Sequence, residues 1–195
     1  MLQSKPMPKS PEDTFGGGKK EKERERLAGQ SNLEQFPVWK TLKLGVCKSP
    51  EEYRAALEKA GIMIGKDADE LLENIPYSQE EIEIDLVLVP VGKLGLDGLV
   101  DYMDALERAI KMGFKPCPAE VGLALRLAYA DQPRRFNELR LGMQPIRGTG
   151  TAINLSFIFV MAGAQNNLWL HAEGPRPLVG GDHGSQLVLM RSRVV

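Results

Sequence analysis

The sequence predicts an α+β domain in which two to three N-terminal helices pack on a mainly antiparallel C-terminal sheet of about five to six strands. Two observations support this fold class. Apolar residues recur at helical spacing in several segments between residues 49 and 113, whereas apolar residues alternate with polar or small ones beyond residue 122. Short, turn-rich linkers such as DQPRR, RGTGT and AGAQNN join the later segments, which favours antiparallel hairpins over parallel crossovers.

The domain is expected to occupy residues 34–195, which is enough chain for one domain with its own core. Residues 1–33 contain a glycine triplet, the charged run KKEKERER and few apolar side chains, so we expect a disordered charged tail there. Because glutamates interrupt the basic residues, a solvated tail is favoured over an arm that binds nucleic acid.

The first elements carry clear local signals. FPVWKTLKLGV alternates like a short strand, and SPEEYRAALEKAG follows as a helix. Ser49 is its expected N-cap, Glu52 completes a capping box with Ser49, and Gly61 ends the helix in the left-handed conformation. A shorter helix is predicted to begin at Asp67 and to stop before Pro76.

A strand and a third helix follow. EEIEIDLVLVPV alternates between apolar and acidic residues, and Pro90 indicates either an edge strand or the end of the strand. DGLVDYMDALERAIKMGF predicts a helix that Gly113 closes. Beyond it, LRLGMQ, INLSFIFVM, NLWL and QLVLMRS are expected to be strands.

The stretch KPCPAEVGLALRLAYADQP is interpreted as a short helix that leads into a buried strand. Pro118 suits the first position of a helix that ends near Gly122, which places Cys117 at the N-cap. The alternation over Leu123–Tyr129 predicts the strand.

Cys117 has two interpretations. It is either a small, half-buried residue that begins a turn, or a nucleophile whose pKa is lowered by the positive end of the helix dipole. In the second case Glu120, or a histidine such as His171, would complete the reactive group of a small hydrolase or transferase. The buried residue is the favoured interpretation.

Arg126 also has two interpretations. A covered arginine on a strand requires a carboxylate, and Glu120 and Asp131 are the nearest in sequence, which would tie the helix to the sheet. Alternatively, Arg126 and Arg140 share one sheet face and bind an anion. If Arg134 and Arg135 extend this face, it would bind nucleic acid weakly. A formal net charge of -1 argues against a dedicated nucleic-acid binder.

Other site types lack their sequence patterns. The spacing of His171, Asp182 and His183 matches no closed zinc signature, and no phosphate-binding loop follows a strand, so neither a metal nor a cofactor is expected. The first residues show no apolar core typical of a signal peptide, and no apolar run is long enough to span a bilayer, so we expect neither a signal peptide nor a membrane partner. Two cysteines form no secreted disulfide framework, which favours a cytoplasmic protein.

Several motifs occur in order between Phe36 and Arg193: FPVWKTLKLG, SPEEYRAALEKAGIMI, CPAEVG with LRLAYADQP, LRLGMQPI, LWL and a last strand ending in arginine. Together they resemble a family of small bacterial cytosolic proteins that has no assigned function. In that family a proline often stands at the position of Leu123, which implies a helix that breaks into a strand there. The resemblance implies one domain in a bacterial cytosol.

The function that the sequence favours is a binding or accessory module without catalysis. No complete catalytic constellation is visible, and a hairpin-rich sheet has edges to which a protein partner can add a strand. The small enzyme built on Cys117 or Glu120 is the first alternative, and weak nucleic-acid binding through the arginines is the second.

Overall fold

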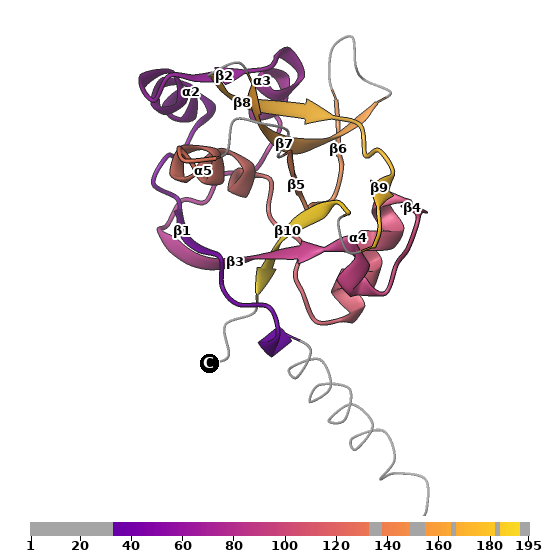
Figure 1. Cartoon of the computed structure of the whole chain (residues 1–195). Helices are drawn as coiled ribbons and strands as arrows, with labels where there is room; N and C mark the ends of the chain where they lie inside the picture. Colours follow the sequence, from indigo (N-terminus) through magenta and orange to yellow (C-terminus); the bar gives the residue numbers. More distant parts are fainter. Residues whose placement is uncertain (1–32, 133–137, 149–154, 165–166, 182–183, 192–195) are drawn as a thin grey trace, which may run out of the picture.

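The computed structural model (Figure 1) describes residues 33–132, 138–148, 155–164, 167–181 and 184–191. These residues form an α+β structure, as expected. The helices are α2 (Pro50–Lys59), α3 (Lys66–Leu72), the 3₁₀ helix η2 (Val91–Leu94), α4 (Tyr102–Lys111) and α5 (Glu120–Ala128). The strands are β1 (Lys40–Leu44), β2 (Ile62–Ile64), β3 (Ile82–Pro90), β4 (Leu99–Val100), β5 (Leu139–Leu141), β6 (Ile146–Arg147), β7 (Ser156–Ala164), β8 (Asn167–Glu173), β9 (Leu178–Val179) and β10 (Gln186–Arg191). Residues 1–32 of the predicted tail lie outside the described residues, and the tail was predicted one residue too long, because Leu33 is buried in the core.

The main sheet is larger and more mixed than predicted. Its eight strands include the ordered path β1-β3-β10-β5-β7-β8-β2, with β6 paired to β7. The pairs β10–β5 and β2–β8 are parallel and the other pairs of this sheet are antiparallel. The last strand of the chain, β10, lies in the middle of the sheet between β3 and β5, so the expected succession of hairpins holds only from β6 to β8. β4 and β9 form a separate two-stranded ribbon.

The local signals of α2 are confirmed with one difference. The hydroxyl of Ser49 accepts a hydrogen bond from the backbone N–H of Glu52, at 3.3 Å. The carboxylate of Glu52 accepts from the N–H of Lys48, at 2.8 Å, one residue earlier than a capping box with Ser49 requires. Gly61 follows the helix with a φ of 67°, a left-handed conformation that a glycine adopts without steric cost.

Two predicted helix starts are displaced. α3 begins at Lys66 after Gly65, so Asp67 lies in its first turn rather than at its start. α4 begins at Tyr102 because the carboxylate of Asp101 accepts from the N–H of Met103, at 2.8 Å, and caps the helix there. The residues before it are extended and form β4.

The strand predicted over Leu123–Tyr129 is wrong, since residues 120–128 form the helix α5. Every residue from Glu120 to Arg126 is buried, so α5 has no solvent-exposed face over this stretch to impose a helical period on its sequence. Leucine, alanine and arginine all have high helix propensity, and the stretch after Val121 contains no β-branched residue. Alternation of large and small residues in LALRLA therefore reflects packing on several sides rather than a pleated strand.

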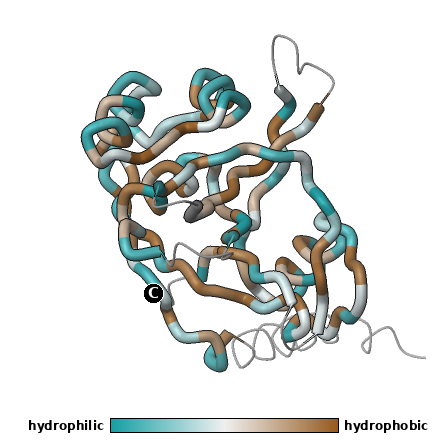
Figure 2. Tube along the Cα trace, turned by 45° about the horizontal axis from the view of Figure 1, so that its top comes forward, coloured by the Kyte–Doolittle hydropathy of each residue, from teal (hydrophilic) through white to brown (hydrophobic). Residues whose placement is uncertain are grey.

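The central position of α5 explains this burial. The helix contacts α2, β1, β7 and β8, and the main sheet curves around it (Figure 1). Hydrophobic residues line the inward-facing segments of the sheet and helix, whereas α2 and α3 carry many hydrophilic positions (Figure 2). Gly122 lies so close to β7 that a Cβ atom built on it would be 2.9 Å from the Cβ, Cγ and Cδ2 atoms of Phe159.

Replacing Gly122 by alanine should therefore destabilise the protein by about 1–3 kcal/mol through overpacking, although alanine is favoured over glycine in a helix by about 1 kcal/mol. The free energy of unfolding in urea measures the effect. The double variant Gly122→Ala/Phe159→Leu should recover part of the loss because the smaller side chain makes room. A Gly122→Ala protein more stable than the parent would contradict this packing.

Candidate functional site

The buried carboxylate of Glu120 joins three parts of the chain at the start of α5. Its side chain is 1% exposed. Oε1 accepts hydrogen bonds from the N–H of Gly45 and from the hydroxyl of Tyr53, each at 3.0 Å, and Oε2 accepts from the N–H of Ser78 at 2.8 Å. Because these donors come from the segment after β1, from α2 and from the segment before β3, the carboxylate fixes their positions around α5.

The hydroxyl of Tyr53, on α2, lies in the same buried environment as the carboxylate of Glu120. Burial raises the pKa of its hydroxyl, and the nearby charge of Glu120 raises it further. The hydroxyl is therefore a hydrogen-bond donor to the carboxylate over the whole physiological range. Glu120 is held by three donors, an arrangement typical of a structural tie.

Cys117 is buried on the other side of the turn that precedes α5. Its N–H donates to the carbonyl of Gly142 at 2.8 Å, and its thiol lies 3.5 Å from the carbonyl oxygen of Val188. Burial raises the pKa of the Cys117 thiol, which argues against the alternative interpretation of a nucleophile with a lowered pKa and agrees with the favoured one of a packed residue. The helix begins three residues later, with Ala119 at the N-cap, and the thiol is packed in the core rather than aimed at the helix end.

Arg126 is fully buried, but the ion pair predicted with Glu120 or Asp131 is wrong. Its Nη1 donates to the side-chain oxygen of Gln132 and its Nη2 to the carbonyl of Tyr129. Within the described part of the chain, its Nε has no hydrogen-bond partner. Burial lowers the pKa of Arg126 to about 10, so the side chain stays charged at neutral pH.

Arg140 and His171 lie on one face of the main sheet. Arg140 on β5 and His171 on β8 each pair with Val160 on β7, the strand between them. Directly paired residues lie on the same face of a sheet. Arg140 is already neutralised, because its Nε lies 3.2 Å from Glu173 and its Nη2 lies 3.6 Å from Glu138. The imidazole of His171 stacks on the ring of Trp169, with the ring centroids 5.1 Å apart.

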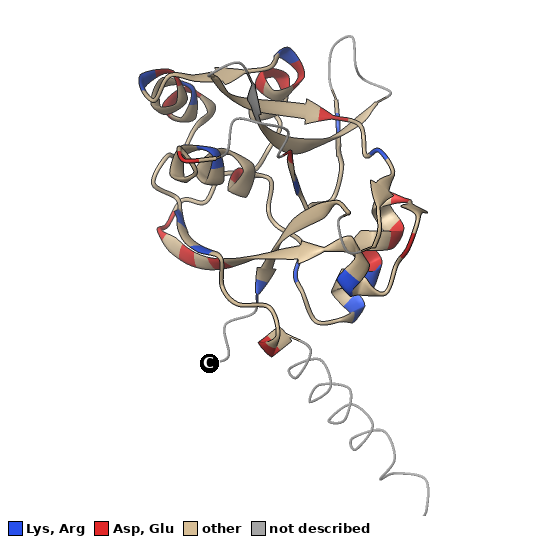
Figure 3. Cartoon of the chain, in the orientation of Figure 1, with Lys and Arg blue, Asp and Glu red and all other residues tan. Residues whose placement is uncertain are grey.

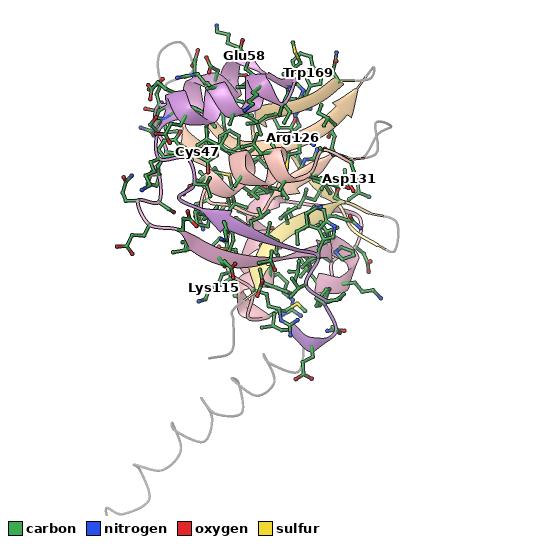
Figure 4. All side chains as sticks on the ribbon, turned by 90° about the vertical axis from the view of Figure 1, so that its left-hand side faces the viewer. Cys47, Glu58, Lys115, Arg126, Asp131 and Trp169 are labelled. Atoms are coloured by element: carbon green, nitrogen blue, oxygen red, sulfur yellow. The ribbon has the colours of Figure 1, made fainter. Side chains whose placement is uncertain are left out.

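The candidate residues from the sequence therefore do not converge on one pocket. The anion face of Arg126 and Arg140 is wrong in its geometry, because Arg126 belongs to α5 and not to a strand. Figure 4 shows Arg126 in the middle of the domain, with Cys47 toward one side and Trp169 near one end. Arg134 and Arg135, which were expected to extend the arginine face, lie outside the described residues.

A groove runs between the edge strand β1 and α5, and we call it the β1–α5 groove. It has a volume of about 380 Å³, within the range of about 300–1,000 Å³ typical of ligand sites. Its lining comes from β1, the loop after it, α2 and α5, and consists of Thr41, Leu42, Lys43, Val46, Cys47, Tyr53, Ala124, Leu127 and Ala128. The walls are largely apolar, and Val46 at the groove is 61% exposed.

Cys47, not Cys117, is the thiol in this groove. It is half-buried, and its pKa is raised by burial and, to a lesser degree, by the carboxylates of Glu52 and Glu120. A thiol held in its protonated form is a poor nucleophile, which argues against covalent chemistry at Cys47.

Sequence reasoning missed this groove because it predicted α5 as a strand. Ala124 and Ala128 are four residues apart, and on a helix this spacing places two small side chains on one face. That pattern is the signal that could have revealed a shallow helix surface opposite β1, but it is meaningful only once the segment is known to be helical.

Comparisons of the chain with protein-family models, curated proteins and solved structures found no match, so the resemblance to a bacterial family stays a prediction. Among the described helices, none has both the length and the apolar character needed to cross a bilayer. In the same part of the chain no three side chains of His, Cys, Asp or Glu form a group that could hold a metal ion. Asp182 and His183, which the sequence analysis considered with His171, lie outside it.

Replacing Glu120 by glutamine should destabilise the protein by about 2–4 kcal/mol, since an amide NH₂ group cannot accept from the donors that the second oxygen serves. The midpoint of urea unfolding measures the loss. Glu107→Gln, which removes an exposed carboxylate from an i,i+4 pair with Lys111, should change stability by less than about 0.5 kcal/mol. Equal, small effects of the two substitutions would contradict the proposed tie.

The two thiols should differ in reactivity toward a disulfide reagent such as DTNB. Cys47 should react slowly in the native protein, with a rate that rises as pH approaches its raised pKa and the thiolate forms. Cys117 should react only after unfolding, because its side chain is 4% exposed. Cys47→Ser should abolish native labelling, whereas Cys117→Ser should not. Faster native labelling of Cys117 would instead support the small enzyme.

Proposed function

We propose that this chain is a non-catalytic binding module of a bacterial cytoplasmic protein type, which holds an extended segment of a partner protein in the β1–α5 groove. The segment adds to the free edge of β1 as a further strand, and one of its side chains enters the space between β1 and α5. Strand addition of this kind combines backbone hydrogen bonds for affinity with side-chain pockets for specificity.

The observation that carries the proposal is the coincidence of a sheet edge with an apolar groove. β1 is the terminal strand of the main sheet and pairs only with β3 among the described strands. Apolar side chains of α5 form the opposite wall, among them Leu127 and Ala128. An edge strand alone is common, but an edge strand that faces a helix across a groove of this size offers both parts of a peptide site.

The positions of the chemically active residues support a role without catalysis. Cys117 is buried with a raised pKa, and Glu120 is held by three hydrogen-bond donors. His171 stacks on Trp169, and no hydrogen bond or ion pair joins it to Glu120 or Cys117 within the described structure. Within the described structure no hydrogen bond joins the thiol of Cys47 to Lys43 or Tyr53, the other titratable residues of the groove lining, and burial raises the pKa of that thiol.

Peptides selected from a displayed library of random heptamers against the full chain test this proposal. We expect sequences with apolar residues at alternate positions, which bind with micromolar affinity. Ala128→Leu should weaken their binding at least tenfold, about 1.4 kcal/mol, because the longer side chain fills the groove. Ala130→Leu adds the same side chain to an exposed residue outside the groove lining, and it should leave the affinity unchanged.

Two outcomes would reject the site. If no selected peptide distinguishes the Ala128→Leu protein from the parent, the β1–α5 groove does not bind extended segments. If both leucine variants weaken binding equally, the peptides recognise the end of α5 and not the groove.

A further inference from the structure

The opposite end of the main sheet has a second free edge, on β2. The N–H of Gly65 donates to the carbonyl of Leu170 at 2.9 Å, so Gly65 directs its N–H toward β8. Backbone groups of successive residues in a strand point to alternate sides, so Met63 also faces β8 while Ile62 and Ile64 face away from it. Within the described structure, no hydrogen bond satisfies the outward N–H and C=O groups of Ile62 and Ile64.

A groove follows this edge between α2 and α3. It has a volume of about 390 Å³, and its lining consists of Arg54, Glu58, Gly61, Ile62, Met63, Ile64 and Asp69. The side chain of Met63 is 45% exposed, so an apolar surface accompanies the free backbone groups. All three residues of β2 line the groove, so the groove gives access to this edge between the two helices.

The groove is acidic. Arg54 is the one basic residue of its lining, and its guanidinium is occupied by two carboxylates, Asp69 at 2.6 Å and Glu73 at 2.7 Å. Glu58 is exposed and forms no ion pair with the described residues. Seven carboxylates and three basic side chains occur from Pro50 to Glu73, and Figure 3 shows both signs of charge on α2 and α3.

We infer that the β2 edge is a second binding site, which takes an extended segment carrying lysine or arginine side chains. The segment pairs with the outward groups of Ile62 and Ile64, and one of its cations reaches the exposed carboxylate of Glu58. Only two residues of β2 offer outward groups, so the site makes few backbone hydrogen bonds and depends on charge complementarity for the rest of its affinity. It is distinct from the β1–α5 groove, because β1 and β2 end the sheet at opposite sides.

Two synthetic peptides of equal length test the inference, Ac-Lys-Val-Lys-Val-Lys-NH₂ and Ac-Glu-Val-Glu-Val-Glu-NH₂. Titrated into the ¹⁵N-labelled full chain, the lysine peptide should shift the amide signals of Ile62 and Ile64 and slow hydrogen exchange at both. The glutamate peptide should bind at least tenfold more weakly. Binding of the lysine peptide should weaken as the salt concentration rises, because salt screens exposed charges.

Matched variants locate the site. Ile64→Pro removes the outward N–H and blocks an incoming strand, whereas Ile64→Ala shortens the same side chain and keeps the N–H. We expect binding at least tenfold weaker for Ile64→Pro than for Ile64→Ala. Glu58→Lys should weaken binding severalfold, whereas Glu107→Lys, the same change on α4, should not. Ala128→Leu should have no effect, so failure of the β1–α5 groove and failure of this site are distinguishable.

The inference is overturned if the two peptides bind equally, or if the lysine peptide shifts amides away from β2 and leaves Ile62 and Ile64 unchanged. A concentration-dependent dimer that protects the same amides without peptide would also overturn it, in favour of a second copy of this chain as the occupant. The amide measurements on the parent protein decide the matter even if Ile64→Pro fails to fold.

Discussion

The carboxylate of Glu120 is the interaction on which the arrangement of this domain depends. It is a buried charge, which costs free energy unless several donors compensate it. Gly45, Tyr53 and Ser78 supply those donors from three separate segments, so all three must be in place before the charge is satisfied. Tyr53 also lines the β1–α5 groove, and the bond from the N–H of Gly45, which directly follows β1, links the end of that strand to α5.

The other end of α5 carries the opposite charge in a different environment. Arg126 lies in the last turn of the helix, where a cation interacts favourably with the helix dipole, as Glu120 does in the first turn. Its described hydrogen-bond partners are the neutral groups of Gln132 and Tyr129, and not a carboxylate. A neutral amide and a carbonyl satisfy part of a buried guanidinium, and the aromatic ring of Tyr129, with its centroid 5.9 Å from the Cζ atom, adds a cation–π contact. Arg126 therefore fixes the turn after α5 to the sheet without an ion pair.

The sequence predicted those parts of the fold that local chemistry determines. Ser49, Pro50 and Gly61 mark the ends of α2 through hydrogen bonds and backbone conformations within a few residues, and the structure has these ends as expected. The strands expected in EEIEIDLVLVPV, INLSFIFVM and QLVLMRS are present as β3, β7 and β10, although residues 157–161 and 187–189 are buried on both faces of the sheet. α5 could not be identified by its period, because its residues from Glu120 to Arg126 are all buried and give no polar face. Its high helix propensity was the correct signal.

The strand order and the two grooves could not be predicted, because both depend on contacts between segments that are far apart in sequence. β10 pairs with β3 and β5, which are far from it in sequence, and no local pattern encodes such a pairing. The edges follow from it, since β1 and β2 become the two ends of the sheet only when the other strands fill the positions between them.

The chain connects these two edge strands directly through α2, a helix of ten residues. Such a helix is about 15 Å long, so the curved sheet brings its two ends to within a short span of one another around α5. α2 contributes Tyr53 to one groove and Arg54 and Glu58 to the other. A sheet that closed completely would pair β1 with β2 and remove both edges, whereas here β1 and β2 are the two ends of the strand order. α2 therefore lies between the two free edges in sequence and lines the groove at each of them.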